Sequence, residues 1–448
     1  MTRNQALRNI EALAMLVTGL LFLGGKPAPS FREFLDAHTK RIVALGVEEF
    51  TMDMREEFKN VPDDKTLQEQ AVFFSAQQQA LAEFDRGSLA SDEQLLFDLV
   101  AYQIDFHQQR VALTLQWSGN GRPLPQRSLH ELPAHELWYA LFVRRFTGTD
   151  ITPQQVFALG ESETRRCLRE IDKIRGQLGI ADSTAFRAHL NDPRFMITDK
   201  QKVIAGFGRI DSTVRSHLKV FVGDVQVPVV EAREWPNAGP STPPGIYRPR
   251  DEHGTGTDQF HINFHGGAYN SRAMEWIYMH EAIPGHHLQV SVRRGQSAND
   301  LRDELFFPGT AEGWACYVEY YGDDLGLYTD PYQRLGKWEW DLVRSVRLVL
   351  DAGIHYHGWS HQQALDYWLQ HIPGQDAIAE REVTRVTNWA AQALSYKVGA
   401  DRIQRMRDAL QHEQGPRFNA ARFHRAYLHM GQVPISVAEG NIRERLQQ

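Results

Sequence analysis

The spacing of apolar residues along this chain predicts a mainly α-helical protein. Apolar side chains recur every three to four residues, with charged faces between them, in five long segments, 31–45, 66–84, 91–111, 152–178 and 198–220. Pro or Gly stands near several of the segment ends, as is typical of helix boundaries. We therefore expect each segment to form a long helix.

Strand signals cluster in only one region, between residues 225 and 264. The runs VQVPVVEA, GIYRP and QFHINF are separated by polar and Pro/Gly-rich sequence, including NAGPSTPPG. This pattern predicts a small sheet just before residue 280. Residues 31–448 are interpreted as a single helical domain, in which two lobes flanking a cleft are one expected arrangement.

Composition narrows the function classes. A chain of 448 residues with 42% hydrophobic content can bury an extensive core. Its net charge of −7 provides no basic field to attract nucleic acid, so we expect no nucleic-acid partner. Cys167 and Cys316 are far apart and form no CxxC pair. We expect them to be buried thiols and not a disulfide or a thiolate metal site.

The N-terminus has the features of an export signal. Arg3 and Arg8 precede the apolar run 12–25, and the helix-breaking sequence KPAPS follows. The run is short for a membrane-spanning helix, which favours residues 1–30 as a signal peptide and an exported, periplasmic or extracellular mature protein with no stable membrane span. Because Glu11 borders the run, the alternative is an ordinary first helix of a cytoplasmic protein.

The residues most typical of catalytic chemistry lie in MHEAIPGHHLQ and in the following TAEGWA. The first segment contains His280, Glu281, His286 and His287, and the second contains Glu312. A hydrolytic zinc site needs neutral nitrogen ligands, an anionic oxygen ligand, an open coordination position and a carboxylate that accepts a proton from water. These two segments supply all the protein groups, so the sequence predicts a metallohydrolase.

The spacing of the histidines requires a break in the helix. Pro284 occupies the position four residues after His280, where a second ligand commonly stands. On an ideal helix His286 would lie about 120° from the face of His280, and His287 would lie about 10 Å farther along the axis. We therefore expect a kink or bulge at residues 283–285. The spacing leaves both His286 and His287 as candidate ligands.

Several segments resemble the ordered signatures of a known family. HEAIPGHHLQ, AEGWACYVEYY, DAGIHYHGWS, REVTRV and QALSYKVG look like the bacterial domain-of-unknown-function family 885, which is similar to the Glu-zincin zinc metallopeptidases. The resemblance extends from about Phe31 and implies a long-helix, metallopeptidase-like body with a cleft. It also implies zinc ligands at His280, His286 and Glu312. Where that family usually has Pro-Gly, this chain has Ala390 and Ala391.

The remaining candidates follow from the chemistry of amide hydrolysis. Glu281 is the expected general base. Tyr396 is the first candidate to donate a hydrogen bond to the developing oxyanion, and His355 is the second. A cationic patch that could hold a substrate carboxylate is expected from Arg381, Arg385 and Lys397.

The sequence thus favours a zinc-dependent hydrolase acting on short peptides or other small amides. The family resemblance implies the small substrate, because a recessed site in a helical cleft would exclude folded proteins. It also implies an edge strand that holds the substrate backbone. Two alternatives stay open: a non-haem iron oxygenase with a 2-His-1-carboxylate site, and a non-catalytic binding protein containing a metal. Glu281 favours the hydrolase, because an oxygenase has no evident use for it.

Overall fold

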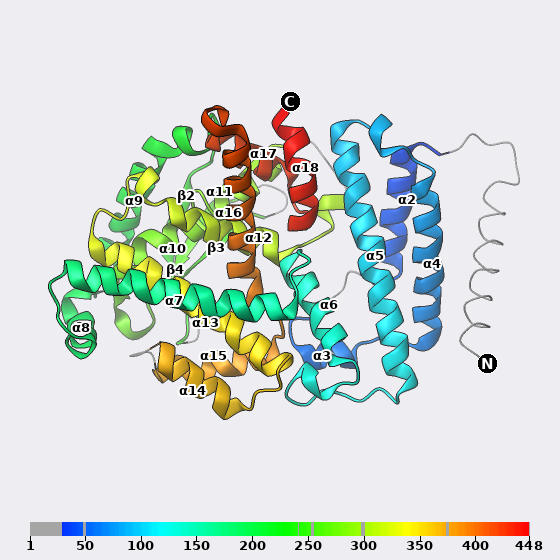
Figure 1. Ribbon diagram of the computed structural model, residues 1–448. Helices are drawn as coiled ribbons and strands as arrows, with labels where there is room; N and C mark the ends of the chain where they lie inside the picture. Colours follow the sequence, from blue (N-terminus) through cyan, green and yellow to red (C-terminus); the bar gives the residue numbers. More distant parts are fainter. Residues whose placement is uncertain are drawn as a thin grey trace, which may run out of the picture.

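The computed structural model describes residues 29–47, 51–240, 242–251, 255–296, 301–372 and 376–447, without the side chains of 376–377. The predicted signal peptide therefore lies almost wholly outside the described residues. Helices dominate the fold, as Figure 1 shows, and the predicted mainly α class is confirmed. Over the described ranges, no helix combines the length and the apolar character needed to cross a bilayer.

All five long helices predicted from periodicity are present. They are α2 (Phe31–Ala44), α4 (Asp64–Ala82), α5 (Ser91–Gly119), α7 (Pro153–Gln177) and α9 (Lys200–Val222). Side-chain caps define several of their starts, because the first N–H groups of a helix lack partners within it. Ser30 caps α2 and Thr152 caps α7, each in a capping box.

The other helices complete the body around these five. Those before the sheet are α3 (Met54–Lys59), α6 (His135–Thr147) and α8 (Ser183–Leu190). Those after it are α10 (Met274–Glu281), α11 (His286–Arg294), α12 (Pro308–Val318), α13 (Pro331–His355), α14 (His361–His371), α15 (Asp376–Asn388), α16 (Leu394–Gln414), α17 (Ala420–Met430) and α18 (Ile435–Gln447).

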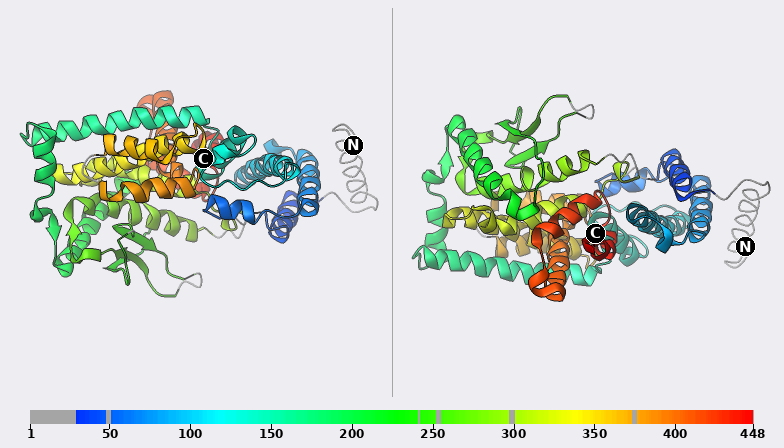
Figure 2. Two further views of the ribbon diagram at one scale, coloured as in Figure 1. Left: turned by 90° about the horizontal axis from the view of Figure 1, so that it is seen from below. Right: turned by 90° about the horizontal axis from the view of Figure 1, so that it is seen from above.

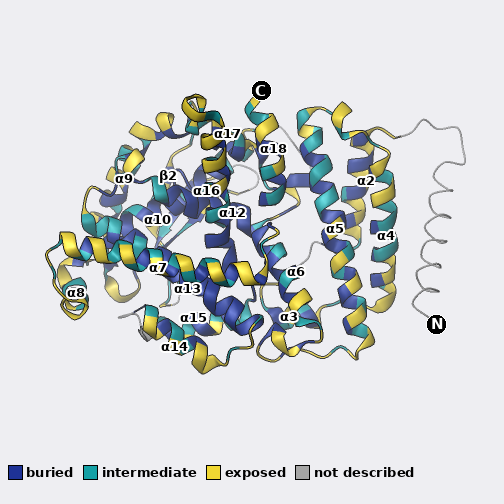
Figure 3. Cartoon of the chain, viewed as in Figure 1, coloured by how far each residue is buried: buried dark blue, intermediate teal, exposed yellow. Residues whose placement is uncertain are grey.

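The helices are arranged in layers. Helices α2, α4 and α5 lie side by side at one end of the molecule (Figure 1). In the rest of the body, α7 lies along one side and the sheet on the opposite side, with α13 and α10 between them, as Figure 2 shows. Helices α12, α13 and α16 form the deeply buried centre (Figure 3). Cys167 and Cys316 are buried free thiols, as predicted.

The predicted sheet is present within residues 225–264. Strand β4 (Asp258–Ile262) is central, parallel to β2 (Val230–Glu234) and antiparallel to β3 (Gly245–Arg248). A separate two-stranded pair joins β1 (Met196–Ile197) to β5 (Tyr269–Asn270). Strand β3 is an edge of the three-stranded sheet and lies against α10. The sheet therefore borders the segment that carries His280 and Glu281.

Candidate metal centre and its cavity

The helix that begins at Met274 is interrupted as its sequence predicts. Helix α10 ends at Glu281, and α11 begins at His286, five residues later. Pro284 cannot continue the helical hydrogen bonds. Gly285 packs so closely on the end of α10 that a Cβ there would lie 1.9 Å from the carbonyl oxygen of His280. The Pro-Gly pair therefore allows the chain to fold back tightly between the two histidines.

The break separates the two adjacent histidines. His286 lines the same cavity as His280, and their ring centroids are 4.9 Å apart. His287 is fully buried elsewhere, with its Nε2 2.9 Å from the carbonyl oxygen of Pro228 and its Nδ1 3.3 Å from the hydroxyl of Tyr247. The geometry therefore favours His286 over His287 as the partner of His280.

Helix α12 is fixed against this break and brings in Glu312. The indole N–H of Trp314 donates to the carbonyl oxygen of Pro284 at 2.8 Å. On the other side of α12, Gly313 faces Gly399 of α16 so closely that a Cβ on Gly313 would lie 2.6 Å from the Cα of Gly399. These contacts explain the Gly and Trp of the AEGWA segment, whose roles the sequence alone did not indicate.

His280, His286 and Glu312 converge on one point. The Oε2 of Glu312 lies 3.4 Å from Nε2 of His280 and 3.5 Å from Nε2 of His286. Ligands about 2.0–2.1 Å from a tetrahedral zinc ion are about 3.3 Å from one another, so the spacing fits. The Glu312 Oε2 is buried and accepts no hydrogen bond from any described residue. Although burial opposes ionisation, the two imidazoles hold the pKa of Glu312 well below its usual range.

The other nitrogen of His280 is oriented by a buried ion pair. Its Nδ1 is 2.8 Å from Oε1 of Glu319, and Oε2 of Glu319 accepts a 2.7 Å hydrogen bond from Arg344. A carboxylate behind an imidazole fixes the ring and its tautomer, as is common at metal sites. The sequence analysis missed Glu319. Its signal is its position seven residues, or two helical turns, after Glu312.

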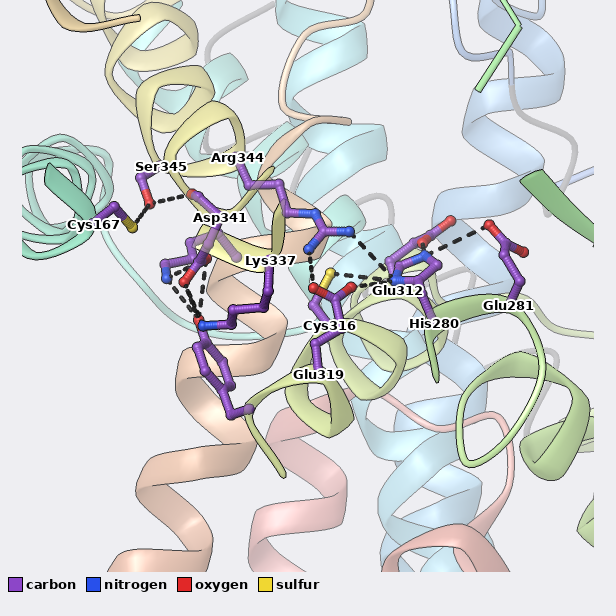
Figure 4. A network of polar contacts seen from close by, with 12 residues as sticks. Cys167, His280, Glu281, Glu312, Cys316, Glu319, Lys337, Asp341, Arg344 and Ser345 are labelled. Atoms are coloured by element: carbon purple, nitrogen blue, oxygen red, sulfur yellow. Dashed lines mark hydrogen bonds and ion pairs between the residues drawn. The ribbon is translucent and has the colours of Figure 1, made fainter. Parts of the chain in front are cut away.

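A second group of potential ligands, on the Nδ1 side of His280, is less suited to a cation. It consists of His280, Cys316 and Glu319. Arg344 already places its positive charge there, with Nη2 3.5 Å from Nδ1 of His280 (Figure 4). Burial also raises the pKa of the Cys316 thiol, which disfavours the thiolate needed for ligation. The Nε2 side, where Glu312 lies, is therefore the better metal site.

Glu281 lies beside the proposed ligands and is held by the sheet. Its Oε1 is 4.0 Å from Nε2 of His280, and its Oε2 accepts a 2.8 Å hydrogen bond from the backbone N–H of Tyr247 in β3. Burial raises the pKa of Glu281. Glu281 also lies close enough to His280 and His286 for these three side chains to bind one metal ion. Its fixed, basic carboxylate suits a general base next to the metal site.

A cavity of about 1110 Å³ covers this group of residues. His280, Glu281, His286 and Glu312 line it. Tyr396 lies on its wall at the start of α16, with its ring stacked 6.5 Å from that of His280. Burial raises the pKa of Tyr396, so its hydroxyl stays protonated and can donate a hydrogen bond. The structure thus brings Tyr396 to the predicted centre.

Comparison with known proteins gives the family. The model of the family described as "Bacterial protein of unknown function (DUF885)" matches residues 122–442. The chain belongs to the DUF885 family. No curated protein matches.

Solved structures of similar fold extend over most of this DUF885 chain. A "putative lipoprotein" from Colwellia psychrerythraea is 22% identical, with a TM-score of 0.68 over 91% of this chain and 73% of that one. A "putative lipoprotein of unknown function" from Shewanella oneidensis is 18% identical, with a TM-score of 0.62 over 96% of this chain and 91% of that one. At these identities the likeness supports the fold alone.

Two predicted site residues of this DUF885 protein lie away from the cavity. Lys397 is 1% exposed and binds Asp341 and Glu163 at 2.7 and 2.6 Å. Consecutive residues on a helix point about 100° apart, so Lys397 faces away from Tyr396 and from the cavity. His355 is fully buried, and its two ring nitrogens contact the backbone of Leu129 and Val386. Burial lowers its pKa to about 4. Neither residue lines the cavity that His280 and Glu312 share.

The predicted arginines do line the cavity, together with two that were not predicted. Arg381 and Arg385 of α15 lie there, as do Arg344 and Arg347 of α13. Burial lowers the pKa of Arg347, and the nearby charge of Arg385 lowers it further. This wall of the cavity therefore has an excess of positive charge. Arg344 and Arg347 were not predicted because they lie over thirty residues before Arg381 along the chain.

Proposed function

We propose that this protein is a zinc-dependent hydrolase of short peptides or other small amides, with zinc held by His280, His286 and Glu312. One observation carries the proposal. Glu312 Oε2 is a buried carboxylate oxygen with no hydrogen-bond donor among the described residues, nearly equidistant from two imidazole nitrogens. A buried anionic oxygen without a donor is costly, and a bound cation removes that cost.

Zinc, when bound, supplies the Lewis acidity that activates water and polarises a carbonyl group. The residues around it carry out the proton transfers. Glu281 accepts the proton of the attacking water and then gives it to the leaving amine. The Tyr247 N–H holds one oxygen of Glu281, which leaves the other facing His280. Glu319 and Arg344 keep the His280 ring in its orientation.

Tyr396 and strand β3 provide the groups that face the substrate. The Tyr396 hydroxyl donates to the oxygen that gains negative charge as the amide is attacked. In β3, Tyr247 directs its N–H away from the sheet toward Glu281, so this unpaired edge of the strand faces the cavity. An extended peptide can pair with such an edge, which would hold its backbone across the centre.

We infer that the protein acts outside the cytoplasm. The apolar run at residues 12–25 has the pattern of an export signal. The two structures of similar fold are described as putative lipoproteins, which agrees with a place in the cell envelope for those proteins. Fractionation of cells expressing the full chain, with N-terminal sequencing of the product, tests this location.

Metal analysis combined with a peptide screen tests the function. The purified protein is expected to contain one zinc ion and to cleave short peptides. Glu281→Gln should retain zinc and lose about 100- to 10,000-fold in kcat, because general-base catalysis typically contributes that much. His286→Ala should lose zinc, whereas the matched variant His287→Ala should retain it.

Three outcomes would contradict the proposal. Full zinc occupancy in both His280→Ala and Glu312→Ala would remove the ligand assignment. Bound iron together with no hydrolysis of any tested amide would favour an oxygenase instead. Tight zinc binding without turnover would indicate a binding protein.

A further inference from the structure

The charged residues of the cavity differ in whether the protein itself neutralises them. Four arginines line it. Arg344 pairs with Glu319 at 2.7 Å, and Arg347 pairs with Glu382 at 2.6 Å. Arg381 also binds Glu382, at 3.1 Å. Three of the four guanidinium groups therefore have a carboxylate partner.

Arg385 is the exception. No carboxylate of the described residues lies within ion-pair distance of it, and its Nε–H has no acceptor among them. Its Nη2 donates a hydrogen bond to the neutral side chain of Gln392, at 3.0 Å. The aromatic rings of Trp389 and Tyr396 flank the guanidinium, with centroids 5.5 and 6.0 Å from its central carbon. The group is thus held in place with no direct carboxylate partner among the described residues, although its charge acts on nearby Glu382.

The carboxylates of the same cavity all have partners once the proposed zinc ion is bound. They are Glu281, Glu312 and Glu382. Glu281 binds the Tyr247 N–H, Glu312 faces the two histidines, and Glu382 is shared by two arginines. Within the part of the chain that the structure describes, the cavity thus offers a free cation and no free anion. It is suited to a substrate carboxylate and not to an ammonium group.

We propose that Arg385 binds the C-terminal carboxylate of the substrate, so that the enzyme is a carboxypeptidase that removes one or two residues from short peptides. This inference rests on the proposed hydrolase function. Guanidinium and carboxylate groups form paired, charge-assisted hydrogen bonds, which fix the chain end in position as well as binding it.

The distance between Arg385 and the proposed zinc site limits the length of the released fragment. Both groups lie near the Tyr396 ring, which is 6.0 Å from the Arg385 guanidinium carbon and 6.5 Å from the His280 ring, and these two distances limit their separation. An extended chain advances about 3.3–3.6 Å per residue. Once the guanidinium–carboxylate contact is included, the interval has room for one or two residues beyond the cleaved bond. Water adds to the carbonyl carbon, the C–N bond breaks, and the new amine leaves with the proton.

Paired peptides test the inference directly. One N-acetylated peptide is offered as the free acid and as the C-terminal amide, with the products identified by mass spectrometry. The free acid should be cleaved with a kcat/KM about 100-fold higher, because the amide leaves the Arg385 charge unpaired. Arg385→Gln should lower kcat/KM for the free acid to about the value for the amide, with zinc content unchanged. Arg385→Lys should recover part of the loss, since lysine restores the positive charge but cannot form the paired hydrogen bonds of a guanidinium group.

Arg381→Gln is the matched control. It removes a positive charge from the same helix one turn away, but from a residue already paired with Glu382, so the preference for the free acid should fall less than tenfold. Equal cleavage of acid and amide would overturn the inference while leaving the hydrolase intact. Loss of cleavage on N-acetylation would also overturn it, because it would indicate an aminopeptidase.

A binding measurement keeps this test separate from the test of hydrolysis. In zinc-loaded Glu281→Gln, the free acid should bind at least tenfold more tightly than the amide. Adding Arg385→Gln should abolish the difference. Equal affinities in Glu281→Gln would refute carboxylate recognition even if no peptide were hydrolysed, whereas the absence of hydrolysis alone would refute only the proposed function.

Discussion

Two polar clusters lie beside α13 and differ in how their charges are neutralised (Figure 4). The metal-centre cluster contains His280, Glu281, His286 and Glu312. The lysine cluster contains Lys337, Asp341, Lys397, Glu163 and Tyr320. Each cluster has buried members, His280 and Glu281 in one and Lys337, Asp341 and Lys397 in the other, and the remaining members are half-buried. Both clusters combine carboxylates with nitrogen groups.

In the lysine cluster both carboxylates have partners within the protein, which include Arg166 beside Glu163 and Asp341. Asp341 accepts from Lys397, Lys337 and Tyr320, and Lys397 also reaches Glu163. The two lysines hold the pKa of Asp341 far below its usual range against the effect of burial. In the metal-centre cluster, by contrast, Glu312 Oε2 has no hydrogen-bond donor among the described residues. Burial of charge alone does not indicate a functional site. The proposed metal site rests on a buried charge that the described residues leave unpaired beside a cavity.

The same chemical change in the two clusters should have opposite effects, and this is the largest predicted difference. Asp341→Asn should destabilise the protein by about 3–5 kcal/mol, because it leaves buried lysines without their anion, and should leave zinc affinity unchanged. Glu312→Gln should abolish stoichiometric zinc binding but change the unfolding free energy of the metal-free protein by less than about 1 kcal/mol. Urea unfolding in a chelator and metal titration measure the two quantities. Equal destabilisation by Asp341→Asn and Glu312→Gln would contradict the proposed difference between the two clusters.

A second matched pair of variants removes one tyrosine hydroxyl beside each cluster. Tyr396→Phe should lower kcat about 100-fold, or about 3 kcal/mol in the barrier, with zinc content and folding nearly unchanged. Tyr320→Phe removes a hydroxyl bound to Lys397 and Asp341, so it should cost about 1.5–3 kcal/mol of stability. Its kcat should stay near that of the wild type. An unchanged kcat in Tyr396→Phe would remove this residue from the mechanism.

The sequence predicted the parts of the candidate site whose residues lie close together along the chain. The helices followed from their apolar period, and His280, Glu281 and Glu312 lie in two short segments whose residue types indicate their chemistry. Lys397 was misplaced because closeness to Tyr396 in sequence says nothing about which face of α16 it occupies. That face is set by Asp341, 56 residues earlier. Arg347 was missed because it reaches the cavity only through the packing of α13.

Glu319→Gln tests the support behind His280. An amide can still accept the hydrogen bond from the ring but lacks the charge that strengthens it. Zinc affinity should therefore fall about 10- to 100-fold, as is usual when such a supporting residue is changed. Glu163→Gln makes the same change in the lysine cluster and should leave zinc affinity within about twofold. Competition with a chromogenic chelator measures both constants, and equal losses would place Glu163 in the support of the metal.

The smallest predicted effect concerns a second buried carboxylate on α13, Asp351. It accepts from the Tyr139 hydroxyl and from the backbone N–H of Ala391, and burial raises its pKa to about 8. Because its hydrogen-bond donors all come from the protein, we expect Asp351 to have a structural role.

Ala391 itself has a φ of 63°, in the left-handed region that favours glycine, at one of the two positions where the family usually has Pro-Gly. Ala391→Gly should therefore raise the unfolding free energy by about 0.5–1 kcal/mol while the N–H still binds Asp351, with kcat and zinc content unchanged. The neighbouring Ala390, whose φ is not positive, gives the control, since Ala390→Gly should destabilise by a similar amount. If Ala391→Gly instead lowered both stability and kcat, the methyl group of Ala391 would be holding the turn that positions Tyr396.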